Sequence, residues 1–244
     1  MFQPASLKGD SPTPIDENVR KKFIPIYLLV IILSFVPVSI LEYYIILYLW
    51  RTPFYLMFVL LFPLNLIILI YLLQFSATLI SFLFLKTVNL IHTPKEGIFE
   101  RNIKDKEYYF WNLRNIIKKW PLYVAASNPF PWFKNRFTLR FFGVKIGKHT
   151  LCDNTWISSE FVKIGKNVIL GMNSTILTFG IEQDKFILKR ILIEDGALIG
   201  AKCVLLPGTV VKKKAKLGAH SYSEYDFILK EDGLYRGHPA KIID

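Results

Sequence analysis

The 244-residue sequence predicts two kinds of structure in one chain, an N-terminal transmembrane helical hairpin and a C-terminal all-β parallel β-helix. Two long apolar runs predict the hairpin. Aliphatic residues at every sixth position predict the β-helix. A basic, aromatic stretch between them predicts a connecting amphipathic helical segment. We expect a flexible cytoplasmic tail over residues 1–22, the hairpin over 23–86, a collar over 87–143 and the β-helix with a closing tail over 144–244.

The composition separates apolar residues from charge along the chain. Hydrophobic residues make up 52% of the sequence, and the formal net charge is +12. The apolar excess lies between Phe23 and Leu85, whereas the positive charge lies almost entirely outside that stretch. This division is typical of a membrane protein whose polar parts face an anionic leaflet or an anionic cofactor. The two cysteines, Cys152 and Cys203, lack the spacing of a metal site or a disulfide framework, so we expect reduced core residues.

The two apolar runs, residues 23–50 and 54–85, each exceed the roughly 20 apolar residues that a membrane-spanning helix needs. Neither has the layout of a cleaved signal peptide. Pro53, in the short link between them, disfavours one continuous helix, so we expect the chain to turn back. Basic residues flank both outer ends of the hairpin. The positive-inside rule therefore predicts that both termini and the β-helix are cytoplasmic.

Glu42 is the one acidic residue inside the apolar runs. A carboxylate within a membrane is a candidate for function, which for this chain would lie in the hairpin itself. Alternatively, Glu42 lies near the outer interface, where it is hydrated or packs against the neighbouring helix.

The collar is strongly basic and rich in tryptophan. From Arg101 to Arg140 the sequence has nine Lys or Arg and two Asp or Glu residues. Residues 104–120 fit one amphipathic helix, which we expect Pro121 to end. Such a helix suits the headgroup layer and predicts contact with membrane lipids. Alternatively, it packs on the first coil of the β-helix. Basic–aromatic segments also bind nucleic acid, which we do not expect for a segment tethered beside a bilayer.

The C-terminal part of the chain repeats with a period of six. The residues at this period are Ile146, Cys152, Ser158, Ile164, Leu170 and Ile176, and after a break Ile193, Ile199, Leu205, Val211 and Leu217. Each period predicts one short strand and a tight turn, and three periods predict one triangular coil whose aliphatic residues fill the interior. We expect coils from Val144 to Ser221. The break from Thr178 to Arg190 predicts a loop that leaves the wall, and the segment from Gly237 to Lys241 predicts a closing tail.

Three segments, IGKNVIL, IEDGALIGAKCVLLPGTVV and GHPAKII, resemble the hexapeptide-repeat acyltransferases. The order of coils, ejected loop, two more coils and Gly-x-Pro-Ala-Lys tail is similar to that family as well. The upstream RFFGVKIGKHT resembles the start of the repeat in a membrane-linked subset, which also occurs as the terminal domain of Pls-like peptide synthetases. The resemblance covers about residues 97–244. It implies a left-handed β-helix, a homotrimer and an acyl-CoA cosubstrate.

The resemblance also implies a cofactor groove between adjacent coiled domains, where backbone amides of the later coils hold the thioester. The residues implied for the pantetheine groove are Gly200, Ala201, Gly218 and Ala219. The residues implied for the CoA phosphates are Lys213, Lys214 and Lys241. Ammonium groups suit a polyanionic cofactor. The alternative for the run from Lys212 to Lys214 is a solvated turn.

The usual base of this family is a histidine on the ejected loop, in a His-x-x-Glu-x-Asp pattern. The corresponding segment here reads FGIEQD, so Glu182 and Asp184 are the implied catalytic residues and Phe179 stands at the histidine position. Glu182 could act as the base if the groove desolvates its carboxylate. The histidines elsewhere are weaker candidates, which we expect to be structural or exposed: His92, His149, His220 and His238. They show no three-histidine grouping, so we expect no metal site.

These features predict a membrane-anchored acyl-CoA-dependent O- or N-acyltransferase at the cytoplasmic leaflet. Its acceptor would be a sugar nucleotide, a lipid-linked glycan or a similar molecule. The alternative is a non-catalytic trimeric membrane scaffold derived from an acyltransferase, which Phe179 favours because it cannot accept a proton.

Overall fold

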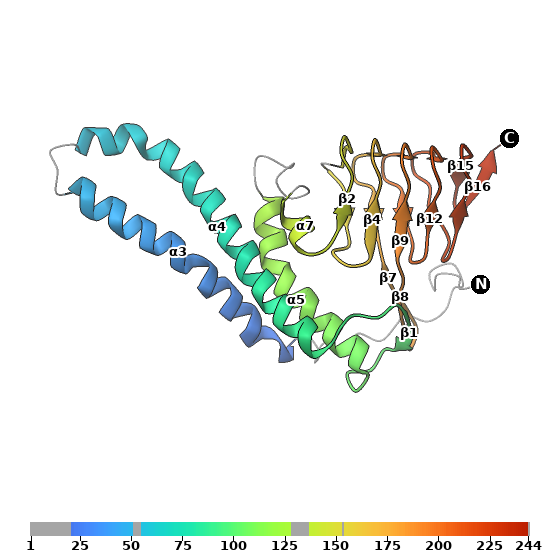
Figure 1. Ribbon diagram of the computed structural model, residues 1–244, viewed down its shortest axis with the longest axis horizontal. Helices are drawn as coiled ribbons and strands as arrows, with labels where there is room; N and C mark the ends of the chain where they lie inside the picture. Colours follow the sequence, from blue (N-terminus) through green and yellow to red (C-terminus); the bar gives the residue numbers. More distant parts are fainter. Residues whose placement is uncertain (1–20, 51–54, 128–136, 153, 244) are drawn as a thin grey trace. The chain divides into compact units, whose positions relative to one another are not determined.

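The computed structural model describes residues 21–50, 55–127, 137–152 and 154–243 (Figure 1). The described residues form two compact units. One unit combines residues 21–93 with residues 112–127, and the other combines residues 94–111 with the remainder of the chain from residue 137. The predicted tail lies outside the described residues up to residue 20, as does the link that contains Pro53.

The first unit is built on two long helices, α3 (Ile24–Trp50) and α4 (Tyr55–Ile91). Their stretches Ile24–Tyr48 and Val59–Ile91 are long and apolar enough to cross a membrane, with mean hydropathies of 2.6 and 2.3. Most of their apolar side chains are exposed. The expected end of the second helix at residue 86 is wrong, because α4 continues to Ile91, three residues before Pro94.

Glu42 of α3 contacts α4, in agreement with the alternative that it packs against the neighbouring helix. The side-chain amide of Asn65 donates a hydrogen bond of 2.7 Å to Oε1 of Glu42. Both residues are half-buried. The carboxylate therefore joins the two helices of the hairpin.

The collar helix α5 (Lys106–Ala126) continues past Pro121, so the expected end at residue 120 is wrong. A proline inside a helix removes one N–H donor and leaves the carbonyl four residues earlier without its helical partner. That carbonyl belongs to Ile117, and the Ser81 hydroxyl of α4 donates a hydrogen bond of 3.0 Å to it. The helix passes Pro121 because a neighbouring helix supplies the missing donor.

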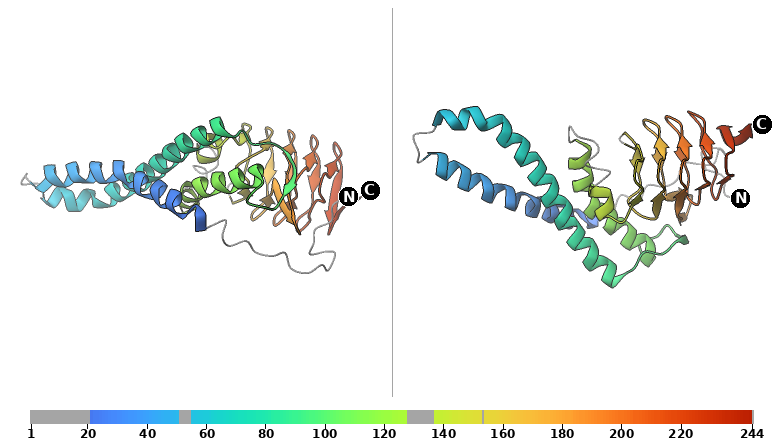
Figure 2. Two further views of the ribbon diagram at one scale, coloured as in Figure 1. Left: turned by 90° about the horizontal axis from the view of Figure 1, so that it is seen from below. Right: turned by 45° about the horizontal axis from the view of Figure 1, so that its top comes forward.

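The second unit contains three parallel sheets wound as a β-helix (Figures 1 and 2). One sheet consists of β2 (Lys145–Ile146), β4 (Val162–Ile164), β9 (Ile191–Ile193), β12 (Val210–Val211) and β14 (Ile228–Leu229). The second consists of β5 (Ile169–Leu170), β10 (Leu198–Ile199), β13 (Lys216–Leu217) and β15 (Leu234–Gly237), with β16 (Ala240–Ile243) at its edge. The third consists of β3 (Trp156–Ile157), β6 (Thr175–Ile176) and β11 (Val204–Leu205).

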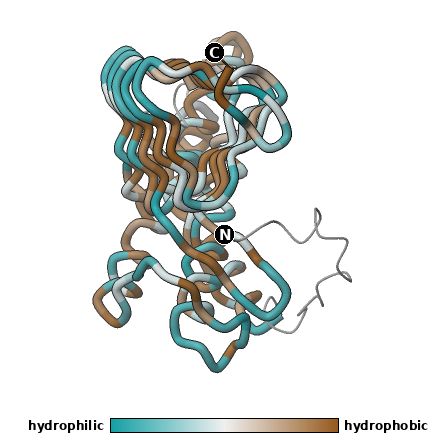
Figure 3. The backbone as a smooth tube through the Cα atoms, turned by 90° about the vertical axis from the view of Figure 1, so that its right-hand side faces the viewer, coloured by the Kyte–Doolittle hydropathy of each residue, from teal (hydrophilic) through white to brown (hydrophobic). Residues whose placement is uncertain are grey.

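The strand register confirms the predicted coil. Ile146 pairs with Ile164, 18 positions later, which is three periods of six. Ile164 pairs with Ile193, 29 positions later, so 11 residues leave the wall in between. The hydrophobic positions of successive coils stack in columns (Figure 3). Cys152 and Cys203 are buried and are not joined in a disulfide, as predicted.

The β-helix continues one coil beyond its predicted end at Ser221. Strands β14 and β15 extend the two longer sheets in parallel, and their side chains Leu229 and Tyr235 are buried. The six-residue pattern misses this coil because Tyr235 replaces the usual aliphatic residue. The predicted closing tail forms a hairpin in which Gly237 of β15 pairs with Ala240 of β16.

The ejected segment is not a simple loop. It forms a hairpin of β7 (Phe179–Glu182) and β8 (Lys185–Leu188). A third strand, β1 (Gly97–Glu100), pairs antiparallel with β8. This strand was not predicted, because four residues inside the predicted collar carry too little alternation to indicate a strand. A short helix, α7 (Leu139–Phe141), precedes the first coil.

Candidate active site

The catalytic residues that the resemblance implies lie at the tip of the β7–β8 hairpin. Glu182 ends β7 and pairs with Lys185 of β8. Between them, Gln183 and Asp184 form the turn, in which Gln183 has a φ of 52°. The hairpin therefore carries Glu182 away from the wall of the β-helix on two paired strands.

Glu182 forms a short hydrogen bond with the last coil. The hydroxyl of Tyr225 donates to Oε1 of Glu182 at 2.6 Å. Tyr225 is 4% exposed, and Glu182 is half-buried. Burial, with further contributions from the hydrogen bond and the charge of Glu182, raises the pKa of the Tyr225 hydroxyl far above its ordinary value. The hydroxyl therefore stays protonated and keeps donating its hydrogen bond to Glu182.

Tyr225 reaches Glu182 by passing close to the backbone of β7. A Cβ atom at Gly180 would lie 2.4 Å from the Tyr225 hydroxyl oxygen. Any side chain there would displace the tyrosine, so glycine is required for this approach. The sequence did not point to Tyr225 as a site residue. The one sequence feature that could have indicated it is a large aromatic residue at a turn of the repeat.

Phe179, at the position of the expected histidine, lies in an aromatic cluster. Its ring is 4.9 Å from that of Trp111, which in turn is 4.6 Å from that of Phe186. Tyr108 and Phe99 complete the cluster, at 5.3 and 6.4 Å from Phe186. The cluster joins the first turns of α5, β1 and both strands of the hairpin. Position 179 therefore packs the hairpin in place and supplies no proton acceptor.

Asp184 is exposed and is held through its backbone. Its carbonyl accepts a hydrogen bond of 2.7 Å from the amide of Arg101. The Arg101 guanidinium donates to the carbonyl of Gln183 at 3.4 Å. These contacts fix the turn beside Glu182, which is a positioning role for the backbone of Asp184.

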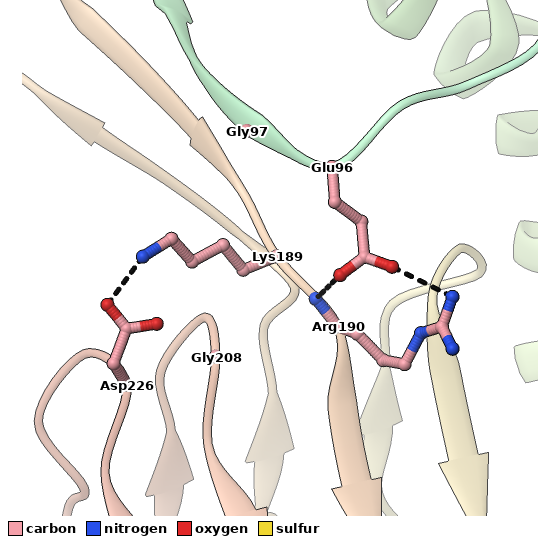
Figure 4. A pocket seen from close by; sticks show the side chains of 6 residues that line it. All are labelled: Glu96, Gly97, Lys189, Arg190, Gly208 and Asp226. Carbon is pink, nitrogen blue, oxygen red and sulfur yellow. Dashed lines mark hydrogen bonds and ion pairs between the residues drawn. The ribbon is translucent and has the colours of Figure 1, made fainter.

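Two ion pairs hold the base of the hairpin (Figure 4). Glu96 accepts hydrogen bonds from the backbone amide of Arg190 at 2.9 Å and pairs with its guanidinium at 2.8 Å. Lys189 pairs with Asp226, the residue after Tyr225. A shallow pocket of about 380 Å³ lies between these pairs. Its lining residues are Glu96, Gly97, Lys189, Arg190, Gly208 and Asp226.

The four residues implied for the pantetheine groove stack at one corner of the β-helix. A Cβ atom at Gly200 would lie 2.4 Å from the amide nitrogen of Ala219 in the next coil. The amides of Gly200 and Gly218 donate to the carbonyls of the next coil, Leu217 and Tyr235, at 2.7 Å each. These two amides therefore stabilise the stacking of coils, and a thioester would need other donors at this corner.

The lysines implied for the CoA phosphates lie elsewhere. Lys213 and Lys214 are exposed at the corner after β12, whereas Gly200 and Gly218 follow strands of the second sheet. Glu194 accepts a hydrogen bond from the Lys213 amide at 3.2 Å and pairs with Lys212 at 3.0 Å. The second lysine site is Lys241, exposed on β16 opposite Arg236.

The four histidines are distributed over other parts of the fold. His149 and His220 are exposed at turns, each with a φ of 57°. His238 lies in the closing tail, with its ring 5.8 Å from that of Tyr222. His92 follows α4 and belongs to the helical unit. Among the described residues, no group of three or more His, Cys, Asp or Glu side chains could hold a metal ion.

Comparison with known proteins identifies the repeat. Residues 161–182 and 190–222 match the family model of the hexapeptide repeat of succinyl-transferase. The two matched stretches lie on either side of the segment that contains β8. The family match thus covers the central and later coils of the β-helix.

One curated relative is the putative acetyltransferase YvoF of Bacillus subtilis, 28% identical over 124 residues, which cover 49% of this chain and 71% of the relative. Among solved structures, the hexapeptide-repeat acetyltransferase VCA0836 of Vibrio cholerae is similar, with 26% identity and a TM-score of 0.39. That match covers 41% of this chain and 61% of the Vibrio chain. A galactoside acetyltransferase in complex with coenzyme A matches with 18% identity and a TM-score of 0.44, over 53% of this chain and 79% of the other.

The predicted resemblance is therefore confirmed in the coils that the family model covers. Hexapeptide repeats of this kind form left-handed β-helices, in agreement with the parallel 18-residue coils seen here. Over these coils the chain is similar to the hexapeptide-repeat acyltransferases.

Proposed function

We propose that this protein is a membrane-anchored acyltransferase that moves an acyl group from acyl-CoA to a hydroxyl or amine. The observation that carries the proposal is the position of Glu182 on the ejected hairpin. Its carboxylate accepts a hydrogen bond of 2.6 Å from the hydroxyl of the buried Tyr225. The family match and the acetyltransferase relative support the reaction type.

In the proposed reaction, Glu182 replaces the histidine base of the family. The acceptor oxygen or nitrogen attacks the thioester carbonyl, and its proton passes to the Glu182 carboxylate. The bond between the carbonyl carbon and sulfur then breaks, and CoA leaves as the thiolate, which takes up a proton. Tyr225 is a positioning residue, because its hydroxyl donates to Oε1 of Glu182 and fixes the carboxylate on the hairpin.

We further propose that the cofactor site forms between subunits of a homotrimer. Within one chain, Lys213 and Gly200 lie at different corners, so one groove that uses both requires two chains. Exposed apolar residues support a subunit interface on the second sheet. Ile169 and Leu198, with exposed fractions of 46% and 38%, lie on the neighbouring strands β5 and β10. Leu234, 44% exposed, lies on β15, and Lys216 of β13 separates it from Leu198.

The two apolar helices support the proposed membrane anchor. The positive-inside rule predicts a cytoplasmic β-helix, where acyl-CoA is available. The acceptor would then be a sugar nucleotide, a lipid-linked glycan or a similar molecule at the cytoplasmic leaflet. Membership of the membrane-linked subset and contact with lipids remain part of this proposal.

The test is release of CoA from acetyl-CoA by the full-length protein in detergent, with a panel of sugar nucleotides and lipid-linked sugars as acceptors. Glu182→Gln should lower kcat by about 100- to 10,000-fold, the usual contribution of a positioned base. Glu231→Gln changes an exposed carboxylate on the last coil and should leave kcat unchanged. Equal turnover by the Glu182→Gln variant would remove Glu182 as the base.

A second variant distinguishes the enzyme from the scaffold alternative. If the natural protein releases no CoA while Phe179→His does, the chain is a lapsed acyltransferase. If the natural protein has turnover, the scaffold alternative is wrong.

A further inference from the structure

The first two coils of the β-helix carry a basic surface that the proposed acyl transfer does not use. We call it the first-coil basic surface and define it by five exposed residues. They are Arg140, Lys145, Lys148, Lys163 and Lys166.

The strand register brings these cations together. Lys145 of β2 and Lys163 of β4 are direct partners in neighbouring parallel strands, about 4.8 Å apart along the β-helix. Lys148 and Lys166 follow at the same corner of the same two coils, where the amide of Asn167 donates to the carbonyl of Lys148 at 3.1 Å. The guanidinium of Arg140 donates to the carbonyl of Ile146 at 2.9 Å, at the start of the first coil.

The β-helix itself does not require lysine at these positions. On the later strands of this sheet, the positions in register with Lys163 hold Leu192, Val210 and Ile228. Like charges that face each other across neighbouring strands destabilise a sheet. The first two coils therefore accept a cost in stability that the later coils avoid.

The first-coil basic surface is separate from the lysines implied for CoA. Along the shared corner, Asp195 lies between Lys166 and Lys213 in successive coils. Oδ1 of Asp195 accepts a hydrogen bond of 2.7 Å from the amide of Lys166. Asp195 thus separates the lysines of the first two coils from Lys213 along this corner.

We propose that the first-coil basic surface binds the anionic phospholipid headgroups of the membrane that anchors the chain. This inference rests on the membrane anchoring of the proposed function. Clustered lysines beside a membrane anchor attract anionic leaflets, and the tether keeps the local concentration of headgroups high. Headgroup contact would hold the first coils at the bilayer surface. The acceptor at the leaflet would then lie within reach of the same domain.

The experiment uses the full-length protein in nanodiscs of phosphatidylcholine alone or of phosphatidylcholine with phosphatidylglycerol. A membrane-impermeant amine reagent labels the lysines, and mass spectrometry gives the labelling rate of each. We expect Lys145, Lys148, Lys163 and Lys166 to react several-fold more slowly in the anionic discs. Because salt screens charges beyond about 10 Å at 0.1 M, high salt should restore their labelling. Lys216 and Lys230, exposed on later coils, should react equally in both discs.

Variants separate headgroup contact from other causes of protection. The double change Lys145→Glu and Lys163→Glu should abolish the protection of Lys148 and Lys166, whereas Lys216→Glu with Lys230→Glu should preserve it. Equal labelling of the natural protein in both discs would overturn the inference and leave the acyl-transfer proposal intact. Protection by acetyl-CoA in neutral discs would assign the surface to a soluble polyphosphate and also overturn it. A chain that does not enter nanodiscs would contradict the anchoring first, and this inference with it.

Discussion

At the scale of single residues, the contact between Glu182 and Tyr225 distinguishes this site from the pattern that the sequence resembles. Position 179 contributes an aromatic ring to the packing of the hairpin, and the carboxylate three residues later receives the hydrogen bond from the last coil. The sequence points to Glu182 because it stands at the glutamate position of the loop pattern that the chain resembles. Tyr225 could not be found in this way, since it lies 43 positions after Glu182 and the winding of the coils brings the two together.

Replacing Tyr225 by phenylalanine removes this hydrogen bond with little change in volume. We expect the free energy of unfolding to fall by about 1.5–3 kcal/mol, the usual range for a hydrogen bond to a charged group. Chemical denaturation of the detergent-purified protein measures it. Tyr235→Phe is the matched control, because Tyr235 is equally buried and accepts a hydrogen bond only from the neutral amide of Lys230. An equal or larger loss for Tyr235→Phe would contradict the assigned strength of the Tyr225 contact.

The raised pKa of Tyr225 also predicts a dependence of stability on pH. The folded protein binds this proton more tightly than the unfolded chain does. The stabilisation is therefore fully present below pH 10.0, the ordinary tyrosine value, and is lost as the pH rises toward the folded pKa. Thermal unfolding above pH 10.0 should show a smaller loss of stability in Tyr225→Phe than in the natural protein. Identical alkaline profiles for the two proteins would contradict the raised pKa.

At the scale of elements, the hexapeptide pattern predicted the coils well because each period is local. The interior positions follow from six consecutive residues, and the register then repeats every 18. Contacts between distant segments were not predictable in this way. Strand β1 pairs with the distant β8, and Glu96 forms an ion pair with Arg190, 94 positions later. Pro121 was misjudged for the same reason, since its helix depends on a hydroxyl from another helix.

The stacked glycine corner predicts different effects for two similar substitutions. An alanine at Gly200 would place its Cβ 2.4 Å from the backbone of Ala219, which cannot move without disturbing the coil. We expect Gly200→Ala to lower the free energy of unfolding by about 1–3 kcal/mol. An alanine at Gly218 would place its Cβ 3.3 Å from the flexible side chain of Arg236 and 3.4 Å from the carbonyl oxygen of Tyr235, and should cost clearly less. Denaturant unfolding compares the two, and equal losses would contradict this packing of the coils.

The ion pair at the base of the hairpin predicts a local effect on dynamics. Glu96→Ala removes the acceptor of the Arg190 amide and guanidinium. Hydrogen exchange should then become faster at Arg190 and along β8, because the third strand is held less firmly. The exposed Glu231→Ala serves as the control and should leave these amides unchanged. Unaltered exchange in Glu96→Ala would show that strand pairing and the aromatic cluster alone hold the hairpin.

At the scale of the whole molecule, composition and periodicity predicted the helices and the parallel sheets of the chain. The apolar excess predicted the helices of one unit, and the six-residue period predicted the sheets of the other. The family resemblance implied cofactor-binding residues that lie at separate corners of the β-helix within one chain. Sequence periodicity describes a single coiled domain, so it carries no information about which corners meet when several chains assemble.

The central claim, that this β-helix takes acyl groups from CoA, is tested most directly by calorimetric titration of acetyl-CoA into the full-length protein in detergent. We predict saturable binding heat that Lys213→Ala with Lys214→Ala weakens and that Lys145→Ala with Lys163→Ala, on the first-coil basic surface, leaves unchanged. The absence of binding heat at high protein concentration, from a protein whose β-helix is intact by circular dichroism, would contradict the claim.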